Sequence, residues 1–402
     1  MKMKKITWVV LFVLLAGFAT AQELKLPYYN AYPPANSDFS YFCSHSFPNG
    51  QPAKVTAPGE LDVRSCDISA WDLTQYTAQE LADVISFDSK TKFPPKAKLP
   101  KGFSPKKILQ NGKNPGLGVR ALHKQGITGE GVSIAVIDQS LLLSHQEYAS
   151  NVIFYEEEPF WKGDSSSMHA PAVVSIAVGK KVGIAPKARV FALAPRFGEK
   201  LPNDRYDARP MTDMLRRVAQ INAQLAPDEK IRVVSISRGF NETNLGATEW
   251  SEAKNALEKD GVAVFTTNDV STLSRNHSLD NPEDVSKYCR SAYWFDKESI
   301  PHLSPDMTDV VVPTDFRVVA SQSGPADYVH FANGGLSWAV PYVAGLYALG
   351  VQVYPQLTKK IFMKTALETS DVRSCEYQGE SFSMKLINPQ RLINKLKELN
   401  NK

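Results

Sequence analysis

The chain has 402 residues, of which 43% are hydrophobic and 22% are charged, a balance typical of a globular protein that excludes disorder throughout. The formal net charge is +4, from 46 basic and 42 acidic residues. Three of the basic residues lie within the first five positions, and removing them would leave 43 basic against 42 acidic residues. A chain this close to neutral offers no electrostatic basis for binding nucleic acid or an anionic membrane surface.

The N-terminus is expected to be a secretory signal peptide covering residues 1–21. A basic start from Lys2 to Lys5 precedes the apolar run Ile6–Ala16, and Ala19–Ala21 is a small-residue cleavage motif. A membrane anchor is the alternative, but the apolar run is shorter than the roughly 20 residues that a span requires. We therefore expect an exported protein, secreted or periplasmic, with no membrane span in the mature chain.

Residues 22–103 show no sustained helix or strand pattern and are expected to form an irregular N-terminal region. The exception is Thr77–Ile85, where Thr77 and Glu80 have the spacing of a helix capping box. Residues 93–107 are rich in proline and lysine and are expected to be a solvated linker, with binding of an anionic partner by the lysines as the alternative. Two roles stay open for residues 22–103: a pro-segment that is removed, and an accessory arm that is kept.

The chain contains four cysteines, and an even number in an exported protein permits two disulfides. Pairing by proximity would join Cys43 to Cys66 and Cys289 to Cys375, whereas four free thiols are the alternative. No Cys-x-x-Cys spacing suggests a zinc site. We expect no cofactor, and no compact acidic loop allows a calcium site to be assigned.

From residue 104 to residue 402, short apolar strands alternate with helices. The strands are expected at Val132–Ile137, Val190–Leu193, Ile231–Ile236 and Val262–Thr266, and the helices at Met211–Leu225, Glu249–Lys259 and from Ser337 onward. This alternation predicts an α/β domain with a mostly parallel sheet and helices on both faces. The apolar stretch 339–354 is expected to be one of its buried helices. In such sheets, functional sites lie at the C-terminal ends of the strands.

Three polar residues occupy such positions. Asp138 follows the first strand, His169 opens a helix of small residues, and Ser337 follows two glycines at a helix N-terminus. Taken singly, each residue could have a purely structural role: Asp138 could cap a turn, and Ser337 could be an ordinary helix N-cap. Together they supply a nucleophile, a base and a carboxylate that orients the base. The order Asp, His, Ser is that of the subtilisin arrangement.

The sequence around these residues resembles that of the subtilases, the subtilisin-like serine peptidases, from about Asn114 to Asp371. Four blocks stand in the family's order: Val136-Ile137-Asp138 with His145 further on, His169–Ser175, the intact Gly-Ile-Ala-Pro-Lys-Ala of residues 183–188, and Gly335–Gly345 around Ser337. The resemblance implies a three-layer subtilisin-like fold and a catalytic triad of Asp138, His169 and Ser337. It assigns His145 a structural hydrogen bond instead of a catalytic role.

The resemblance implies two further sets of site residues. Ser237, Arg238 and Gly239 match the strand that pairs with an extended substrate, and Asn268 matches the residue whose amide stabilises the oxyanion. Two interpretations of Arg238 stay open: its side chain selects acidic substrate side chains, or it points away from the substrate.

Several residues depart from the family pattern without removing a reacting group: Gln139, Ser140, Ala170, Thr267, Leu336 and Trp338. We therefore expect a divergent serine endopeptidase that is secreted, monomeric and acts on protein or peptide substrates. The alternative is a catalytically inactive binding scaffold with the same fold.

Overall fold

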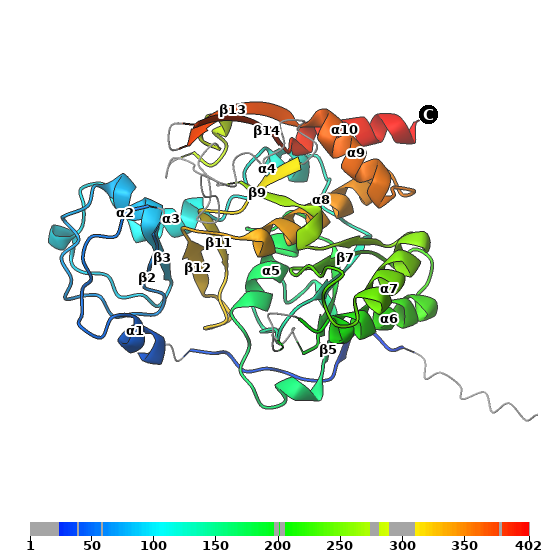
Figure 1. Ribbon diagram of the computed structural model, residues 1–402, viewed down its shortest axis with the longest axis horizontal. Coiled ribbons are helices and arrows are strands. Elements are labelled where there is room, and N and C mark those ends of the chain that lie inside the picture. The colour runs from blue at the N-terminus through cyan, green and yellow to red at the C-terminus, as the bar shows by residue number, and fades with distance from the viewer. Residues whose placement is uncertain are drawn as a thin grey trace, which may run out of the picture.

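A computed structural model describes residues 24–37, 40–57, 59–196, 201, 206–273, 281–288, 310–377 and 380–401. The expected signal peptide, residues 1–21, lies outside these ranges. The centre of the fold is a six-stranded sheet with strand order β1-β5-β6-β4-β7-β8, in which every neighbouring pair is parallel (Figure 1). Its strands are β1 (Tyr28–Tyr29), β4 (Ser133–Ile137), β5 (Val152–Glu157), β6 (Arg189–Ala194), β7 (Ile231–Ile236) and β8 (Ala263–Phe265).

Helices cover both faces of this sheet because its strands are apolar on both sides. In β4, Ile134 and Val136 face one core, whereas Ala135 and Ile137 face the other, as the two-residue period of a strand requires. The first core contains α5 (His169–Val178) and α8 (Leu336–Val353), and the second contains α6 (Arg209–Gln224) and α7 (Ala247–Lys259). The expected three-layer α/β fold with a mostly parallel sheet is confirmed.

The apolar stretch after Ser337 forms the core helix α8. Among the described residues, α8 is the one helix that is long and apolar enough to cross a membrane, and 78% of it is buried inside the fold. The expected buried helix is therefore confirmed. Two further helices, α9 (Lys359–Thr369) and α10 (Pro389–Asn400), pack beside it.

Two smaller sheets flank the main one. The order β13-β14-β10-β9 joins β9 (Ser271–Leu273) and β10 (Val310–Pro313) to the hairpin of β13 (Asp371–Tyr377) and β14 (Glu380–Leu386). The order β11-β12-β3-β2 joins the hairpin of β11 (Arg317–Ala320) and β12 (Tyr328–Phe331) to two strands from the N-terminal region, β2 (Leu61–Asp62) and β3 (Ile85–Asp88). The third sheet therefore connects parts of the chain that lie far apart in sequence.

The described residues between 40 and 111 form a small unit, here called the N-terminal module, which lies beside β11 and β12 (Figure 1). It contains α1 (Ser40–Ser46), α2 (Ala78–Val84), β2, β3 and α3 (Pro105–Asn111) around an apolar core of its own. The capping box of Thr77 and Glu80 is confirmed at the start of α2. The expected solvated linker is wrong, because Phe103 is buried in the module's core and the partly buried Phe93 and Leu99 pack against it.

The expected disulfide between Cys43 and Cys66 is confirmed and closes a sequence separation of 23 residues within the module. Cys375 is also disulfide-bonded. Its expected partner, Cys289, lies outside the described residues.

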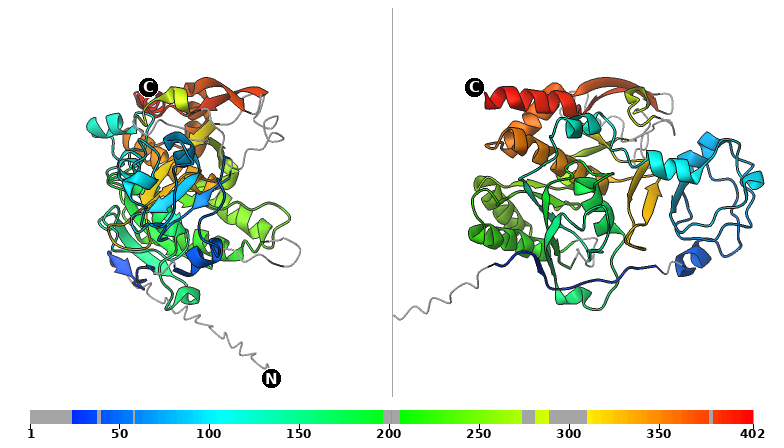
Figure 2. Two further views of the ribbon diagram at one scale, coloured as in Figure 1. Left: turned by 90° about the vertical axis from the view of Figure 1, so that its left-hand side faces the viewer. Right: turned by 180° about the vertical axis from the view of Figure 1, so that it is seen from behind.

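An extended arm, residues 24–37, precedes the module and follows the surface of the main domain (Figure 2). Its strand β1 pairs with β5, and the Asn30 side chain both donates to and accepts from the backbone of Glu157. Farther along, the carbonyl of Pro34 accepts a hydrogen bond from the backbone N–H of Ser166, three residues before His169. The arm thus lies against the segment that leads to one of the expected catalytic residues.

Candidate active site

Asp138 and His169 meet where β4 ends and α5 begins. Nδ1 of His169 lies 2.8 Å from Oδ1 and 3.0 Å from Oδ2 of Asp138. Because an ionised carboxylate only accepts hydrogen bonds, Nδ1 carries the proton and Nε2 is left as the basic nitrogen. Asp138 is only 2% exposed, and its Oδ1 also accepts the backbone N–H of Gln139 at 2.8 Å. The pair has the geometry of a general base and its orienting carboxylate.

The environment of His169 changes its pKa in two opposing directions. Burial lowers the pKa, whereas the negative charge of Asp138 and its hydrogen bond raise it, and the net result is a pKa above the ordinary value of 6.5. The Asp138 carboxylate therefore favours the imidazolium, which is the form the base takes after accepting a proton.

Ser337 is the second residue of α8 and is half-buried, whereas the neighbouring Leu336 is exposed. The helix contains Pro341, which has no N–H and cannot donate to the carbonyl four residues earlier. The carbonyl of Ser337 instead accepts a hydrogen bond of 2.9 Å from Oγ of Ser237. Oγ of Ser337 in turn lies 3.5 Å from the carbonyl of Ser237. These contacts tether the expected nucleophile to the end of β7.

Aromatic packing and a close helix contact bring His169 and Ser337 into the same region. The ring of Trp338, next to Ser337, lies 5.4 Å from the ring of His169 between centroids. Farther along α8, a Cβ on Gly345 would lie 2.6 Å from Cβ of Ile184, so only glycine allows this approach. Of the expected triad residues, Asp138 and His169 are in direct contact, and Ser337 is next to Trp338, whose ring packs against that of His169.

The three expected substrate-strand residues extend beyond β7 and are held in different ways. Ser237 is bonded to Ser337, as described above. The guanidinium of Arg238 stacks over the Tyr206 ring at 4.1 Å, and burial lowers the pKa of Arg238. A Cβ on Gly239 would lie 2.0 Å from Oδ1 of Asn268, so this position requires glycine.

Asn268 lies in the turn Thr267–Asp269, directly after β8. Its Nδ2 donates to the carbonyl of Phe240 at 2.8 Å, which uses one of the two N–H donors of the amide. The turn is held by Asp269: burial raises its pKa, but the ammonium of Lys359, 2.7 Å away, outweighs this and lowers it. Asn268 is therefore packed against the expected substrate strand in a fixed orientation.

His145 has the structural role that the sequence predicted. Its Nδ1 accepts the backbone N–H of Glu147 at 3.2 Å, and its Nε2 lies 2.8 Å from the carbonyl of Asp327. One ring nitrogen therefore accepts and the other donates, which is the neutral imidazole. Burial lowers the pKa of His145 and favours the same form.

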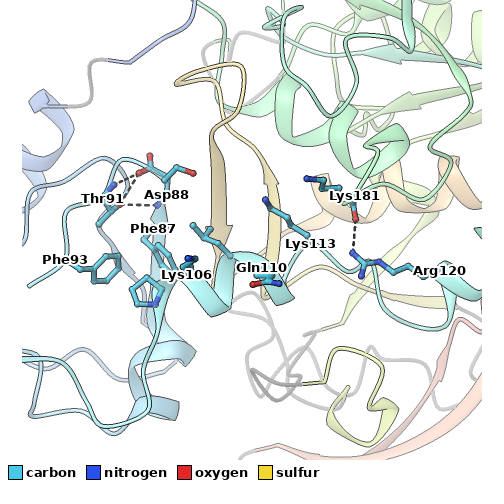
Figure 3. Close-up of a pocket in the computed structure, with 12 residues that line it drawn as sticks. Phe87, Asp88, Thr91, Phe93, Lys106, Gln110, Lys113, Arg120 and Lys181 are labelled. Atoms are coloured by element: carbon cyan, nitrogen blue, oxygen red, sulfur yellow. Dashed lines mark hydrogen bonds between the residues drawn. The ribbon is translucent and has the colours of Figure 1, made fainter. Parts of the chain in front are cut away.

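Two cavities lie near these elements. One of about 570 Å³ adjoins Asn268 and Thr266 and is bounded by Phe240 and Trp250. The other, of about 720 Å³, lies between the N-terminal module and the main domain, and Figure 3 shows its basic side chains, Lys106, Lys113, Arg120 and Lys181. None of the triad residues lines the second cavity.

Within the described part of the chain, no group of three or more His, Cys, Asp or Glu side chains is arranged to hold a metal ion.

The Ser237–Ser337 contact was not expected from the sequence, although Pro341 could have indicated it. A proline four residues after Ser337 leaves the Ser337 carbonyl without its helical donor.

No family model matches the chain. Similar solved structures include the prenylagaramide maturation protease PagA, at 15% identity and a TM-score of 0.46, covering 69% of this chain and 98% of that one. A protease from Pseudoalteromonas arctica PAMC 21717 is 15% identical with a TM-score of 0.48, covering 73% and 98%. A cold-adapted subtilisin-like serine proteinase is 16% identical with a TM-score of 0.41, covering 64% and 89%.

The PatG macrocyclase in complex with peptide is also similar, at 12% identity and a TM-score of 0.47, covering 69% of this chain and 95% of that one. Identities this low transfer no activity.

Proposed function

We propose that the protein is a serine endopeptidase that hydrolyses peptide bonds through an Asp-His-Ser triad. The observation that carries the proposal is the contact between Nδ1 of His169 and the buried Asp138, with the His169 ring against Trp338 beside Ser337. The buried carboxylate fixes the tautomer of His169 and leaves Nε2 as the basic nitrogen. A serine nucleophile needs such a base and a carboxylate that orients it.

In the proposed reaction, Oγ of Ser337 attacks the carbonyl carbon of the peptide while Nε2 of His169 takes its proton. Asp138 holds the imidazole and stabilises the imidazolium. The backbone N–H of Ser337 and the amide of Asn268 stabilise the negative oxygen of the tetrahedral intermediate. His169 then gives the proton to the leaving amine, and the acyl group remains on Ser337. A water molecule, activated by His169 in the same way, releases the acid product.

The substrate is proposed to bind as an extended strand beside Ser237, Arg238 and Gly239. Main-chain hydrogen bonds would supply affinity and pockets for alternate side chains would supply selectivity. The guanidinium of Arg238 stacks on the Tyr206 ring. Of the two interpretations of Arg238, this contact favours the one in which its side chain points away from the substrate over the one in which it selects acidic substrate side chains.

The test is labelling of the purified full chain with a fluorophosphonate probe, which reacts with activated serines. We expect labelling of the wild type and none of Ser337→Ala or His169→Ala. Ser235→Ala is the matched control, since this buried hydroxyl on β7 has no hydrogen-bond partner within the described structure. A folded wild type that does not label would refute the peptidase and favour the inactive binding scaffold. Hydrolysis of extended peptides by the labelled protein would then separate endopeptidase from other acyl-transfer activity.

We also propose that the protein is exported by cleavage after Ala21. The Cys43–Cys66 disulfide supports this, because disulfides persist in oxidising compartments. The mass of the N-terminal peptide of the mature protein tests it: the expected first residue is Gln22, and an intact Met1 would refute it.

A further inference from the structure

We propose that the N-terminal module is a permanent part of the peptidase, and that its Arg64 and Ser86 are positioning residues for the loop that leads to Ser337. The proposal rests on the proposed function, which supplies the role of Ser337. It decides between the two roles left open by the sequence, a removable pro-segment and a retained element, in favour of the second.

The module is joined to the catalytic part of the chain through the strand that precedes this loop. Strand β3 pairs antiparallel with β12, with Asp88 opposite Val329 and Phe87 opposite His330. Strand β12 ends at Phe331, and residues 332–335 then lead directly to α8 and Ser337. The position of β12, and with it the start of the loop, therefore depends on a strand supplied by the module (Figure 1).

Ser86 carries this contact past the end of β12 into the loop. Its Oγ accepts the backbone N–H of Ala332 at 3.0 Å, in a buried position. The same hydroxyl donates to the carboxylate of Glu60, also in the module. Without the module, the N–H of Ala332 would lose its partner, and an unsatisfied buried donor is unfavourable.

Arg64 continues the connection through a series of side chains that pack against one another. Its guanidinium lies 4.9 Å from the centroid of the Phe331 ring and is oriented by Asp62, whose Oδ1 accepts Nε at 2.8 Å. The Phe331 ring lies 5.3 Å from that of Trp338, and the Trp338 ring lies 5.4 Å from that of His169. Three consecutive contacts thus connect the module to the expected catalytic base.

The burial of this series indicates a permanent contact. Phe331 is 6% exposed and Trp338 is 5% exposed with the module in place. Loss of the module would remove the guanidinium from Phe331, the paired strand from β12 and the acceptor from Ala332. A segment designed to leave would uncover an apolar ring two contacts away from His169, so retention of the module is the arrangement that keeps the site assembled.

The first experiment compares Arg64→Ala, Arg64→Lys and Lys54→Ala by the rate of fluorophosphonate labelling of the full chain. Lys54 is a matched control, because it is paired with Glu80 at 2.9 Å and lies 5.3 Å from the Tyr76 ring, all within the module. We expect Arg64→Ala to label about tenfold more slowly, since a small misplacement of catalytic groups costs at least this much. Arg64→Lys should recover part of the rate and Lys54→Ala should label like the wild type. Equal rates for Arg64→Ala and wild type would overturn the positioning role.

The second experiment does not depend on activity. Amide hydrogen exchange at Ala332 is measured in wild type, Ser86→Ala and the control Ser69→Ala, whose hydroxyl bonds Asp67 at the module surface. We expect exchange at Ala332 to be at least about tenfold faster in Ser86→Ala alone, because the buried N–H then lacks its acceptor. Unchanged exchange would overturn the inference even if the wild type labels.

Failure of the wild type to label, with the expected exchange result, would refute the peptidase and leave the module's structural role supported. The mass of the labelled wild-type protein completes the test. We expect it to include residues 40–111, and a labelled form that begins after residue 111 would overturn the retention of the module.

Discussion

The contact between Ser237 and Ser337 gives a quantitative prediction for Ser237→Ala. The substitution removes the hydroxyl that donates to the Ser337 carbonyl at 2.9 Å. Because Pro341 supplies no N–H, this carbonyl would be left without its donor at a partly buried position. Leaving such a group unsatisfied costs about 1–3 kcal/mol, which is the expected decrease in the free energy of unfolding.

The role of the proline is tested by repeating the substitution in a Pro341→Ala background. An alanine at this position restores the helical N–H, which can donate to the Ser337 carbonyl in place of Ser237. Ser237→Ala should then cost less than in the wild type, by about 1 kcal/mol or more, and this difference is the coupling energy of the two positions. Urea denaturation of the four proteins measures it.

An equal cost of Ser237→Ala in both backgrounds would refute the reasoning, because it would show that Pro341 does not create the need for the Ser237 hydroxyl. Ser235→Ala is the control for removing a serine hydroxyl from β7. Its Oγ is buried and has no partner among the described residues, so the substitution should change stability little or increase it.

Three further predictions concern the base, the oxyanion residue and the module. Asp138→Asn removes the charge that raises the pKa of His169, whereas burial continues to lower this pKa. The acid limb of the pH profile of labelling should therefore move to lower pH. The labelling rate should also fall by about 10⁴. A limb that stays in place would contradict the assigned pair. Gly239→Ala would place a Cβ 2.0 Å from Oδ1 of Asn268 and so displace this amide. The labelling rate should fall on the order of 10²-fold, to the level of Asn268→Ala. A wild-type labelling rate for Gly239→Ala would exclude this contact. Reduction of the Cys43–Cys66 disulfide should lower the stability of the module by about 2–4 kcal/mol in thermal unfolding, and an unchanged transition would contradict the assignment.

The elements that the sequence predicted well are those set by local pattern. The strand before Asp138 is a continuous apolar run between glycines and an acidic residue, and the helix at Thr77 has both halves of its capping box within four residues. Asp138 and His169 could be placed together because the ends of parallel strands and the starts of the following helices share one edge of the sheet.

The N-terminal module could not be predicted in the same way. Its strands β2 and β3 are two and four residues long, too short to show a period, and β3 finds its partner β12 about 240 positions later in the chain. Prolines and lysines dominate the composition around Phe93, Leu99 and Phe103, and this composition predicts a linker. They are spaced without regularity and are brought into one core only by the tertiary fold.

The two-residue strand β1 has a consequence for the behaviour of shortened chains. It covers the outer edge of β5, residues Val152–Glu157, where Tyr28 stands opposite Phe154 and Tyr29 opposite Tyr155. A chain that begins after Tyr29 would present these backbone groups to solvent, next to two large aromatic side chains. An open, apolar sheet edge is a template for pairing with another molecule. We therefore expect a chain that begins after Tyr29 to self-associate more readily than the full chain. A tag or truncation at the N-terminus is best kept clear of Leu24–Asn30.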